Sequence, residues 1–271
     1  MSKISNTDRT KYNNEIKALK ENEKIYLTKI NALSKMIDTT NDNLNNYRRI
    51  TIAWFYLTIA EFYCTMNDLS LQFLKRLNEN HLGEARKSYS SALKEIEEFT
   101  GKHLDLAYEE QVEILSSIKK FTAPRVLALS NKFGYVLERI KKGYGDTSKW
   151  KWLLVETEAR YATVIKNLAD LKSIAANDPT KAFYEQKMVL AQKIKEMLKS
   201  ASEHYRDKYS ISTKEIDDMR KAIYIQEELR KVNIYLDSPQ DVETCKKTID
   251  LWNNILERDL SEKEKKKGKK K

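Results

Sequence analysis

The sequence predicts an all-α protein, and three observations lead to this conclusion. Only 6 glycines and 3 prolines occur in 271 residues, which leaves few turns, and charged residues make up 33%, which suits the solvated faces of helices. Apolar residues recur at helical spacing, and we find no sustained alternation typical of a half-buried strand. We therefore expect an elongated antiparallel bundle, or an array of helical hairpins, of about nine helices without a β-sheet.

Two segments carry apolar residues in alternating steps of four and three, the spacing at which one helix packs lengthwise on another. The first seam, within 8–48, is Tyr12, Ile16, Leu19, Glu23, Tyr26, Ile30, Leu33 and Ile37. The second is Trp150, Leu154, Thr157, Tyr161, Val164, Leu168, Leu171 and Ala175. Such a seam closes within one chain or between two, so the spacing leaves the oligomeric state open.

The longest apolar segment, 50–66, is the expected centre of the fold. Its residues are apolar on every side of a helix, so the helix needs neighbours all round it. Glu61 and several threonines argue against contact with lipid, and the segment is shorter than the roughly 20 apolar residues of a bilayer span. We expect it to be a core helix, followed by a return helix over 82–100.

The sharpest break in the sequence is Gly143–Thr147, which contains two glycines. We expect it to separate an N-terminal helical half, 1–142, which contains the central apolar helix, from a C-terminal helical half, 143–260. A lysine-rich tail, 261–271, follows and is expected to be disordered.

Proline and capping residues mark the expected starts of other helices. Pro124 suits the first turn of a helix, because the N–H that proline lacks would have no partner there. Asp178 is expected to cap a helix that begins at Pro179. Ser212 and Glu215 have the spacing of a capping box, which predicts the start of the next helix.

The two cysteines, Cys64 and Cys245, lie in helical patterns and are interpreted as small buried thiols, with a disulfide as the alternative. The polar segment 1–14 shows no signal peptide, which makes the cytoplasm the default compartment, although a trimmed N-terminus would look the same.

The segment Glu84–Leu93 (EARKSYSSAL) resembles the second helix of a tetratricopeptide hairpin, and Trp54-x-x-Leu57-x-x-Ala60 resembles the first. Asp250–Leu256 (DLWNNIL) resembles the second helix again. This resemblance covers about a third of the chain and implies a packed helical array that binds proteins. In general character, the long lysine- and tyrosine-rich helices are also similar to the proteins that sheath spirochaete flagellar filaments, which implies an accessory filament subunit as an alternative.

We find no motif that indicates catalysis. None of the three histidines has a second histidine or cysteine at the spacing of metal ligands. Gly143-Tyr-Gly145 lacks the further glycine of a dinucleotide fingerprint and the Gly-Lys-Ser/Thr of a phosphate loop. We therefore expect no enzyme activity, no metal, no cofactor and no small-molecule substrate.

Aromatic and basic residues gather around the break, where Tyr144, Lys149 and Trp152 are the candidate partner-binding residues. Trp152 lies two positions from the seam residues Trp150 and Leu154, so its side chain should point away from the core and be at least partly exposed. Trp150 itself is interpreted as core.

The net charge is +10, of which 257–271 contributes +4, from eight basic and four acidic side chains. Candidate polyanion-binding residues of this tail are Lys265, Lys266, Lys267, Lys269, Lys270 and Lys271. Because no aromatic residue or arginine lies among them, we expect only nonspecific, salt-sensitive attraction to nucleic acid. The leading prediction is a structural or scaffolding protein that binds other proteins or self-assembles. A peripheral, crescent-type module on an anionic membrane is the alternative.

Overall fold

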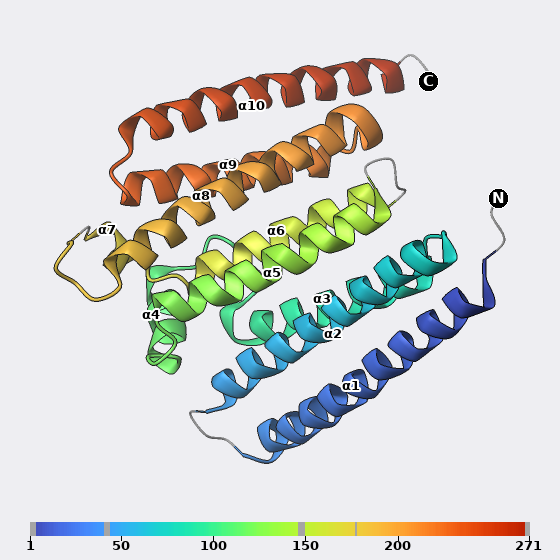
Figure 1. Cartoon of the computed structure of the whole chain (residues 1–271). Helices are drawn as coiled ribbons and strands as arrows, with labels where there is room; N and C mark the ends of the chain where they lie inside the picture. The colour runs from blue at the N-terminus through green and yellow to red at the C-terminus, as the bar shows by residue number, and fades with distance from the viewer. Residues whose placement is uncertain (1–3, 41–43, 146–149, 177, 269–271) are drawn as a thin grey trace. The chain divides into compact units, whose positions relative to one another are not determined.

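The structure, a computed structural model, describes residues 4–40, 44–145, 150–176 and 178–268. These ranges form ten α-helices and one π-helical turn without a strand, so the all-α prediction is confirmed (Figure 1). The chain divides into two compact units. Unit 1 comprises 1–102 and 107–157, and unit 2 comprises 103–106 and 158–271.

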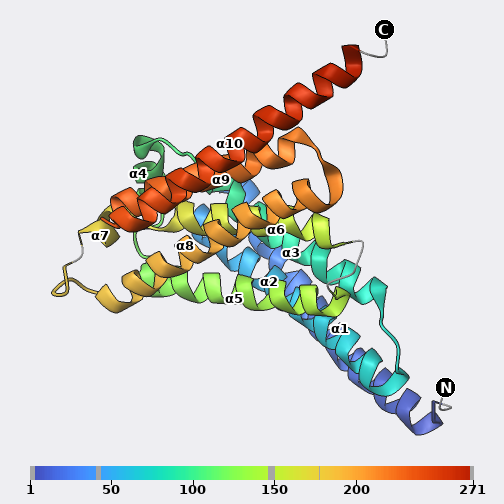
Figure 2. The same cartoon turned by 90° about the horizontal axis from the view of Figure 1, so that it is seen from above.

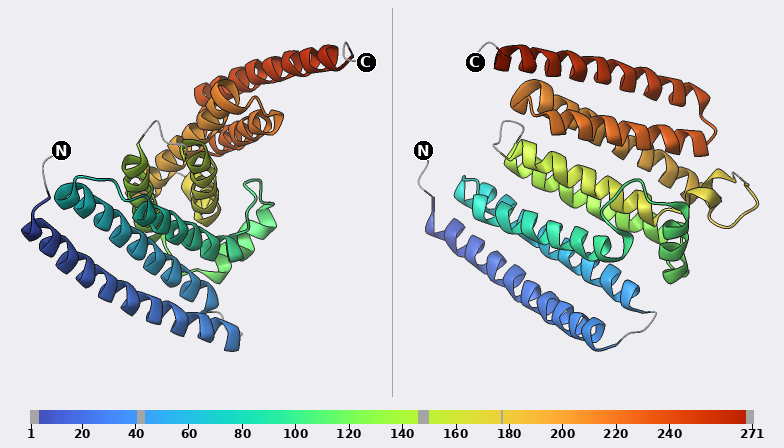
Figure 3. Two further views of the ribbon diagram at one scale, coloured as in Figure 1. Left: turned by 90° about the vertical axis from the view of Figure 1, so that its right-hand side faces the viewer. Right: turned by 180° about the vertical axis from the view of Figure 1, so that it is seen from behind.

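Unit 1 consists of five helices and the start of a sixth. They are α1 (Asn6–Thr39), α2 (Asn45–Leu74), α3 (Glu79–Thr100), α4 (Tyr108–Ser117), α5 (Ala123–Tyr144) and the first turns of α6 (Lys151–Leu168). Helix α2 lies between α1 and α3 and also contacts α5, so it has neighbours on three sides (Figure 3). The expected central helix is therefore confirmed as the centre of this unit.

Packing in unit 1 follows the apolar pattern of the sequence. Leu57 and Met66 of α2 are fully buried, as are Tyr89 and Leu93 of α3. Tyr26, from the first predicted seam, packs edge-on against two α2 rings, with centroid distances of 5.2 Å to Phe55 and 5.8 Å to Phe62. The first seam therefore closes within the chain, against α2.

Local capping sets the starts of several helices in this unit. The Asn78 side chain accepts a hydrogen bond from the backbone N–H of His81 and caps α3. Thr122 is the N-cap of α5, with Pro124 in the first turn as predicted. The Glu110 carboxylate accepts from the backbone N–H of Ala107, at 3.2 Å, where α4 begins.

Unit 2 contains the rest of α6, followed by α7 (Leu171–Ala175), α8 (Tyr184–Asp207), the π-helical turn η1 (Lys208–Thr213), α9 (Ile216–Tyr235) and α10 (Pro239–Gly268). Helix α9 packs against both α8 and α10 (Figure 1). The second predicted seam is wider than expected, because every residue of 161–169 is buried. The second half of α6 is therefore buried on all sides, and not only along one stripe.

Two predicted helix starts in unit 2 are wrong. Helix α8 begins at Tyr184, and the Asp178 carboxylate instead accepts from the backbone N–H and the hydroxyl of Thr180, at 2.9 and 2.7 Å, in a turn. The N-cap of α9 is Glu215, which makes no side-chain capping bond. Because the π-helical turn occupies Lys208–Thr213, the N-cap of α9 lies three residues beyond the expected Ser212, and Lys214 ends the turn with φ 52°.

The division between the units also differs from the expected one. It falls between Thr157 and Glu158, within α6, instead of at Gly143–Thr147. Helix α10 continues to Gly268, so 261–268 is helical where disorder was expected. Lysine and glutamate are good helix formers, which explains the continuation.

Both cysteines are free and buried, as predicted. Burial raises the pKa of Cys64 to about 12. Within the described residues, no helix is both long enough and apolar enough to cross a bilayer.

Candidate functional site

The predicted site at the break is only partly assembled. The Tyr144 ring lies 5.7 Å from the ring of Trp150, and the Arg86 guanidinium of α3 lies 4.7 Å from the centre of the Trp150 ring system. Trp152 is partly exposed, as predicted, with the Lys151 ammonium 5.0 Å from its ring centroid. Tyr144 therefore packs against Trp150, the residue that was interpreted as core. Lys149 lies outside the described residues.

A close contact explains the first glycine of this break. An added Cβ at Gly143 would lie 2.5 Å from a methyl group of Leu82, so a larger residue would force the buried Leu82 side chain of α3 to move. Burial raises the pKa of the Tyr144 phenol, which is consistent with its inward position. These contacts support a packing role for Tyr144 more than a partner-binding role.

The candidate lysines of the tail are only partly described. Lys265, Lys266 and Lys267 lie in the last turns of α10, and Lys269, Lys270 and Lys271 lie outside the described residues.

A surface that the sequence analysis missed lies where α5 packs against α2 in unit 1. Two large aromatic side chains are exposed there, Trp54 to 40% and Tyr135 to 52%. We call this the α2–α5 surface, and its members are Trp54, Glu61 and Asp68 of α2 with Lys132, Tyr135 and Arg139 of α5.

Each cation of the α2–α5 surface has two partners. The Lys132 ammonium forms an ion pair with Glu61 and lies 5.9 Å from the Trp54 ring centroid. The Arg139 guanidinium is 2.5 Å from the Asp68 carboxylate and 5.8 Å from the Tyr135 ring centroid. The side chains of both cations are about four-fifths buried, with exposed fractions of 18% and 20%. The arrangement therefore fixes two cations beside two exposed rings.

Sequence spacing contains a signal for this surface. Trp54, Glu61 and Asp68 are seven residues apart, which places them along one stripe of α2, and Lys132 and Arg139 have the same spacing on α5. The sequence alone does not show that the two stripes face each other.

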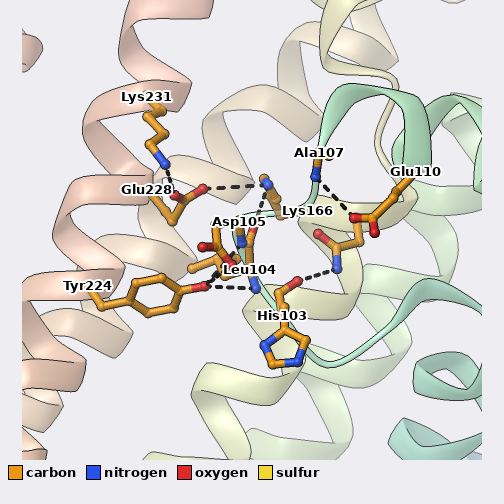
Figure 4. A network of polar contacts seen from close by, with 10 residues as sticks. His103, Leu104, Asp105, Ala107, Glu110, Lys166, Tyr224, Glu228 and Lys231 are labelled. Carbon is orange, nitrogen blue, oxygen red and sulfur yellow. Dashed lines mark hydrogen bonds and ion pairs between the residues drawn. The ribbon is translucent and has the colours of Figure 1, made fainter.

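Unit 2 contains a buried network of charged groups (Figure 4). The Lys166 ammonium donates to the backbone carbonyl of Leu104 and lies 3.6 Å from the Glu228 carboxylate. Both side chains are buried, with exposed fractions of 9% and 3%. Lys231 pairs with the other oxygen of Glu228 at 2.5 Å. Burial lowers the pKa of Lys166, and the Glu228 carboxylate offsets only part of this shift.

The same network holds the four-residue segment 103–106. The Asn167 amide donates to the backbone carbonyl of His103 at 2.9 Å. The Tyr224 hydroxyl accepts from the backbone N–H groups of Leu104 and Asp105, at 3.2 and 3.1 Å, and donates to the Asp105 carboxylate at 2.6 Å (Figure 4). Burial, reinforced by the Asp105 hydrogen bond, raises the pKa of Tyr224 to about 12.

A buried lysine with a lowered pKa is a pattern that also occurs in enzymes. Here both acceptors around Lys166 are groups of the chain itself, a backbone carbonyl and the Glu228 carboxylate. Those acceptors give the ammonium the environment of a structural ion pair that fixes the segment 103–106.

The amino-acid sequence of residues 8–260 matches the TP0443 family. The chain belongs to the TP0443 family. The match includes most of α1 and extends into α10, so it covers residues of both units of this TP0443 family member. No curated protein matches the chain. Because the family match is to TP0443, the tetratricopeptide likeness stays a local resemblance.

This TP0443 family member also has a groove in unit 2, with a cavity volume of about 450 Å³, lined by α8, α9 and α10. Leu229, Asn233 and Cys245 are among its lining residues, and Lys195 pairs with Asp241 at 2.5 Å across it. Among the described residues, no group of three or more histidine, cysteine, aspartate or glutamate side chains could hold a metal ion.

Proposed function

We propose that this TP0443 family member is a non-catalytic structural protein that binds other proteins, a second copy of itself included, through the α2–α5 surface. The observation that carries the proposal is the exposure of Trp54 and Tyr135 beside two cations that are already held in place. Tryptophan, tyrosine and arginine are the residues most enriched at the energetic centres of protein interfaces.

Preorganisation is the first physical reason. A partner that covers Trp54 or Tyr135 gains a large apolar contact area. Lys132 and Arg139 are already positioned by Glu61 and Asp68, so ordering them costs little further conformational entropy on binding.

Charge is the second reason. The α2–α5 surface carries two cations and two carboxylates, a balance of zero in a chain whose net charge is +10. A polyanion gains little from a neutral surface, whereas a protein with both signs of charge can pair with it. The two signs also make the surface complementary to a second copy of itself across a two-fold axis.

Static light scattering over a range of protein concentrations tests self-association. We expect the mass of the wild type to rise above 31.8 kDa and that of the double variant Trp54→Ala/Tyr135→Ala to stay at the monomer value. Tyr235→Ala is the matched control, because Tyr235 is exposed to a similar extent, 56%, but lies on α9. A plateau at twice the monomer mass indicates a closed dimer, and a mass that keeps rising favours a filament subunit.

A photo-crosslinking residue in place of Tyr135 tests the binding of a different protein in the cells that make this chain. We expect a discrete adduct at position 135 and none from the same residue at position 235. A wild type that stays monomeric and also forms no adduct at position 135 would refute the proposed function.

A further inference from the structure

The groove between α8 and α10 has its floor on α9, which packs against both of these helices (Figure 2). Three α9 residues line it, Gln226, Leu229 and Asn233, and all three are buried. Their spacing of three and four positions places them along one stripe of the helix. The cavity volume of about 450 Å³ is in the range of ligand sites between the helices of bundles. We call this site the unit 2 groove.

Two side-chain amides on the floor of the unit 2 groove have unused hydrogen-bonding capacity. The Asn233 amide nitrogen donates to the Cys245 sulfur at 3.5 Å, and its amide oxygen has no hydrogen-bond partner among the described residues. The Gln226 amide oxygen accepts from the Ser202 hydroxyl at 2.8 Å, and its amide nitrogen donates no hydrogen bond within the described part of the chain. Because an unpaired polar group in a buried position is costly, the two amides favour an occupant that both donates and accepts hydrogen bonds.

The two walls of the groove differ in their chemistry. On the α10 wall, Cys245 and Trp252 are buried and provide apolar surface. On the α8 wall, Lys199 and Glu203 are exposed and lie four positions apart. Neither of these two side chains forms an ion pair within the described residues. One cation and one carboxylate are therefore available about one helical turn apart.

The other charged residues of the lining have partners already. Lys195 pairs with Asp241 at 2.5 Å, and the Glu196 carboxylate accepts from the Gln192 amide at 2.8 Å. The described lining residues contain two lysines and three acidic side chains, which gives a charge of −1. This charge does not favour a polyanion such as nucleic acid or a surface of anionic lipid.

The dimensions of the groove match a short peptide in an extended conformation. Gln226 and Asn233 are seven positions apart, or about 10 Å along α9, which is the length of about three extended residues. Lys199 and Glu203 are about 6 Å apart, close to the distance of about 7 Å between alternate residues of an extended chain. Successive side chains of such a chain point to opposite sides, so two alternate side chains would face α8 and the one between them α10.

We propose that the unit 2 groove binds an extended peptide segment of a partner protein, in which an apolar residue lies between an acidic and a basic one. The peptide backbone, which donates through N–H and accepts through C=O, pairs with the Asn233 and Gln226 amides. Its acidic side chain pairs with Lys199 and its basic side chain with Glu203. The apolar side chain packs against Trp252. The groove shares no residue with the α2–α5 surface, so this proposal and the proposed function can fail separately.

An NMR titration of the isotope-labelled full chain tests the proposal with two N-acetylated, C-amidated peptides, Glu-Leu-Lys and Lys-Leu-Glu. We expect at least one of them to bind with a Kd below about 1 mM and to shift the side-chain amide signals of Asn233 and Gln226. The peptides Glu-Leu-Glu and Lys-Leu-Lys, capped in the same way, each place one like charge against the α8 wall. They should bind about fivefold more weakly.

The variant Lys199→Glu tests the charge pairing. Its α8 wall carries two carboxylates in the groove, so the preferred peptide should change to Lys-Leu-Lys. Lys246→Glu is the matched control, because Lys246 is also exposed but is not among the lining residues, and it should keep the preference of the wild type. Circular dichroism confirms that both variants keep their helices.

The variant Asn233→Leu tests the floor of the groove. We expect it to bind the preferred peptide about fivefold more weakly, because a hydrogen bond to the peptide backbone is lost. Its stability toward urea should not fall below that of the wild type, because the unpaired amide oxygen is removed from a buried position. A purely structural role of Asn233 would give the opposite result, a lower stability with unchanged affinity.

Three results would overturn the proposal. The first is that none of the four peptides binds. The second is that Lys199→Glu keeps the peptide preference of the wild type, which would place any binding outside the groove. The third is that folded Asn233→Leu binds the preferred peptide as tightly as the wild type does.

Discussion

The central helices of the two units are buried by different means. Helix α2 buries mainly apolar side chains, among them Ile52, Leu57 and Met66. Helix α9 buries Asp218, Gln226, Glu228 and Asn233 beside its apolar residues (these four are all 5% exposed or less). Apolar burial is roughly proportional to area and needs no particular partner, whereas each buried polar group needs a specific one.

From this difference we expect the two units to tolerate substitutions differently. A missing methyl group in α2 leaves a cavity that neighbouring side chains can partly fill. A missing partner in the α9 network removes part of the compensation of a buried charge, since Glu228 without Lys166 keeps only its pair with Lys231. The following predictions test this contrast, from the largest expected effect to the smallest.

Lys166→Ala should lower the free energy of unfolding by about 4 kcal/mol, because the Leu104 carbonyl loses the Lys166 ammonium and the buried Glu228 carboxylate keeps only the half-exposed Lys231 as a partner. Urea unfolding measures the change. The double variant Lys166→Met/Glu228→Leu is the control, since replacing both charges by apolar side chains should restore most of the stability. If the single and double variants were equally unstable, packing and not charge would hold this site together.

Leu57→Ala should lower the free energy of unfolding by about 3 kcal/mol, through lost burial and a cavity in the centre of unit 1. The conservative variant Leu57→Met keeps the volume and should cost less than about 1.5 kcal/mol. The same urea titrations measure both. Near-equal losses for the two variants would contradict the view that α2 depends mainly on apolar volume.

Tyr224→Phe should lower the free energy of unfolding by about 1 kcal/mol at neutral pH, because the bonds to the segment 103–106 are lost. The pKa of Tyr224 is raised to about 12 from an ordinary value of 10.0. Its proton therefore stabilises the folded state fully below pH 10, and this contribution disappears as the pH rises through 12. Unfolding between pH 9 and 12 should show a shallower decline for Tyr224→Phe than for the wild type.

Trp152→Ala should leave the melting temperature nearly unchanged, with a loss of less than about 0.5 kcal/mol, because Trp152 is partly exposed and Lys151 lies over its ring. Differential scanning calorimetry against Trp252→Ala, which removes a buried tryptophan of α10, provides the comparison. A comparable loss in both variants would place Trp152 in the core.

Features that depend on neighbouring residues were predictable from the sequence. The apolar segment 50–66, the seam that includes Tyr26 and the proline start at Pro124 all depend on periodicity or on local backbone chemistry. The same holds for the two cysteines, whose helical surroundings indicated burial.

Features that depend on distant residues were not predictable. Tyr224 and Asp105 are 119 positions apart, and Lys166 and Leu104 are 62 apart, so no local pattern indicates that 103–106 belongs to unit 2. The π-helical turn replaces the expected capping box, because its extra residue per turn is invisible in a helical periodicity. On the α2–α5 surface, each stripe was visible alone, but its pairing with the other helix required the fold.

The burial of both native thiols has a practical consequence. Only thiolates react readily with maleimides, and Cys64, with a pKa of about 12 and 2% exposure, is almost entirely protonated and inaccessible at neutral pH. Burial likewise raises the pKa of Cys245. A cysteine introduced at position 135 should therefore take up a fluorophore selectively, without replacement of either native residue. A chain labelled at this position could then report on an approaching protein through a change in fluorescence.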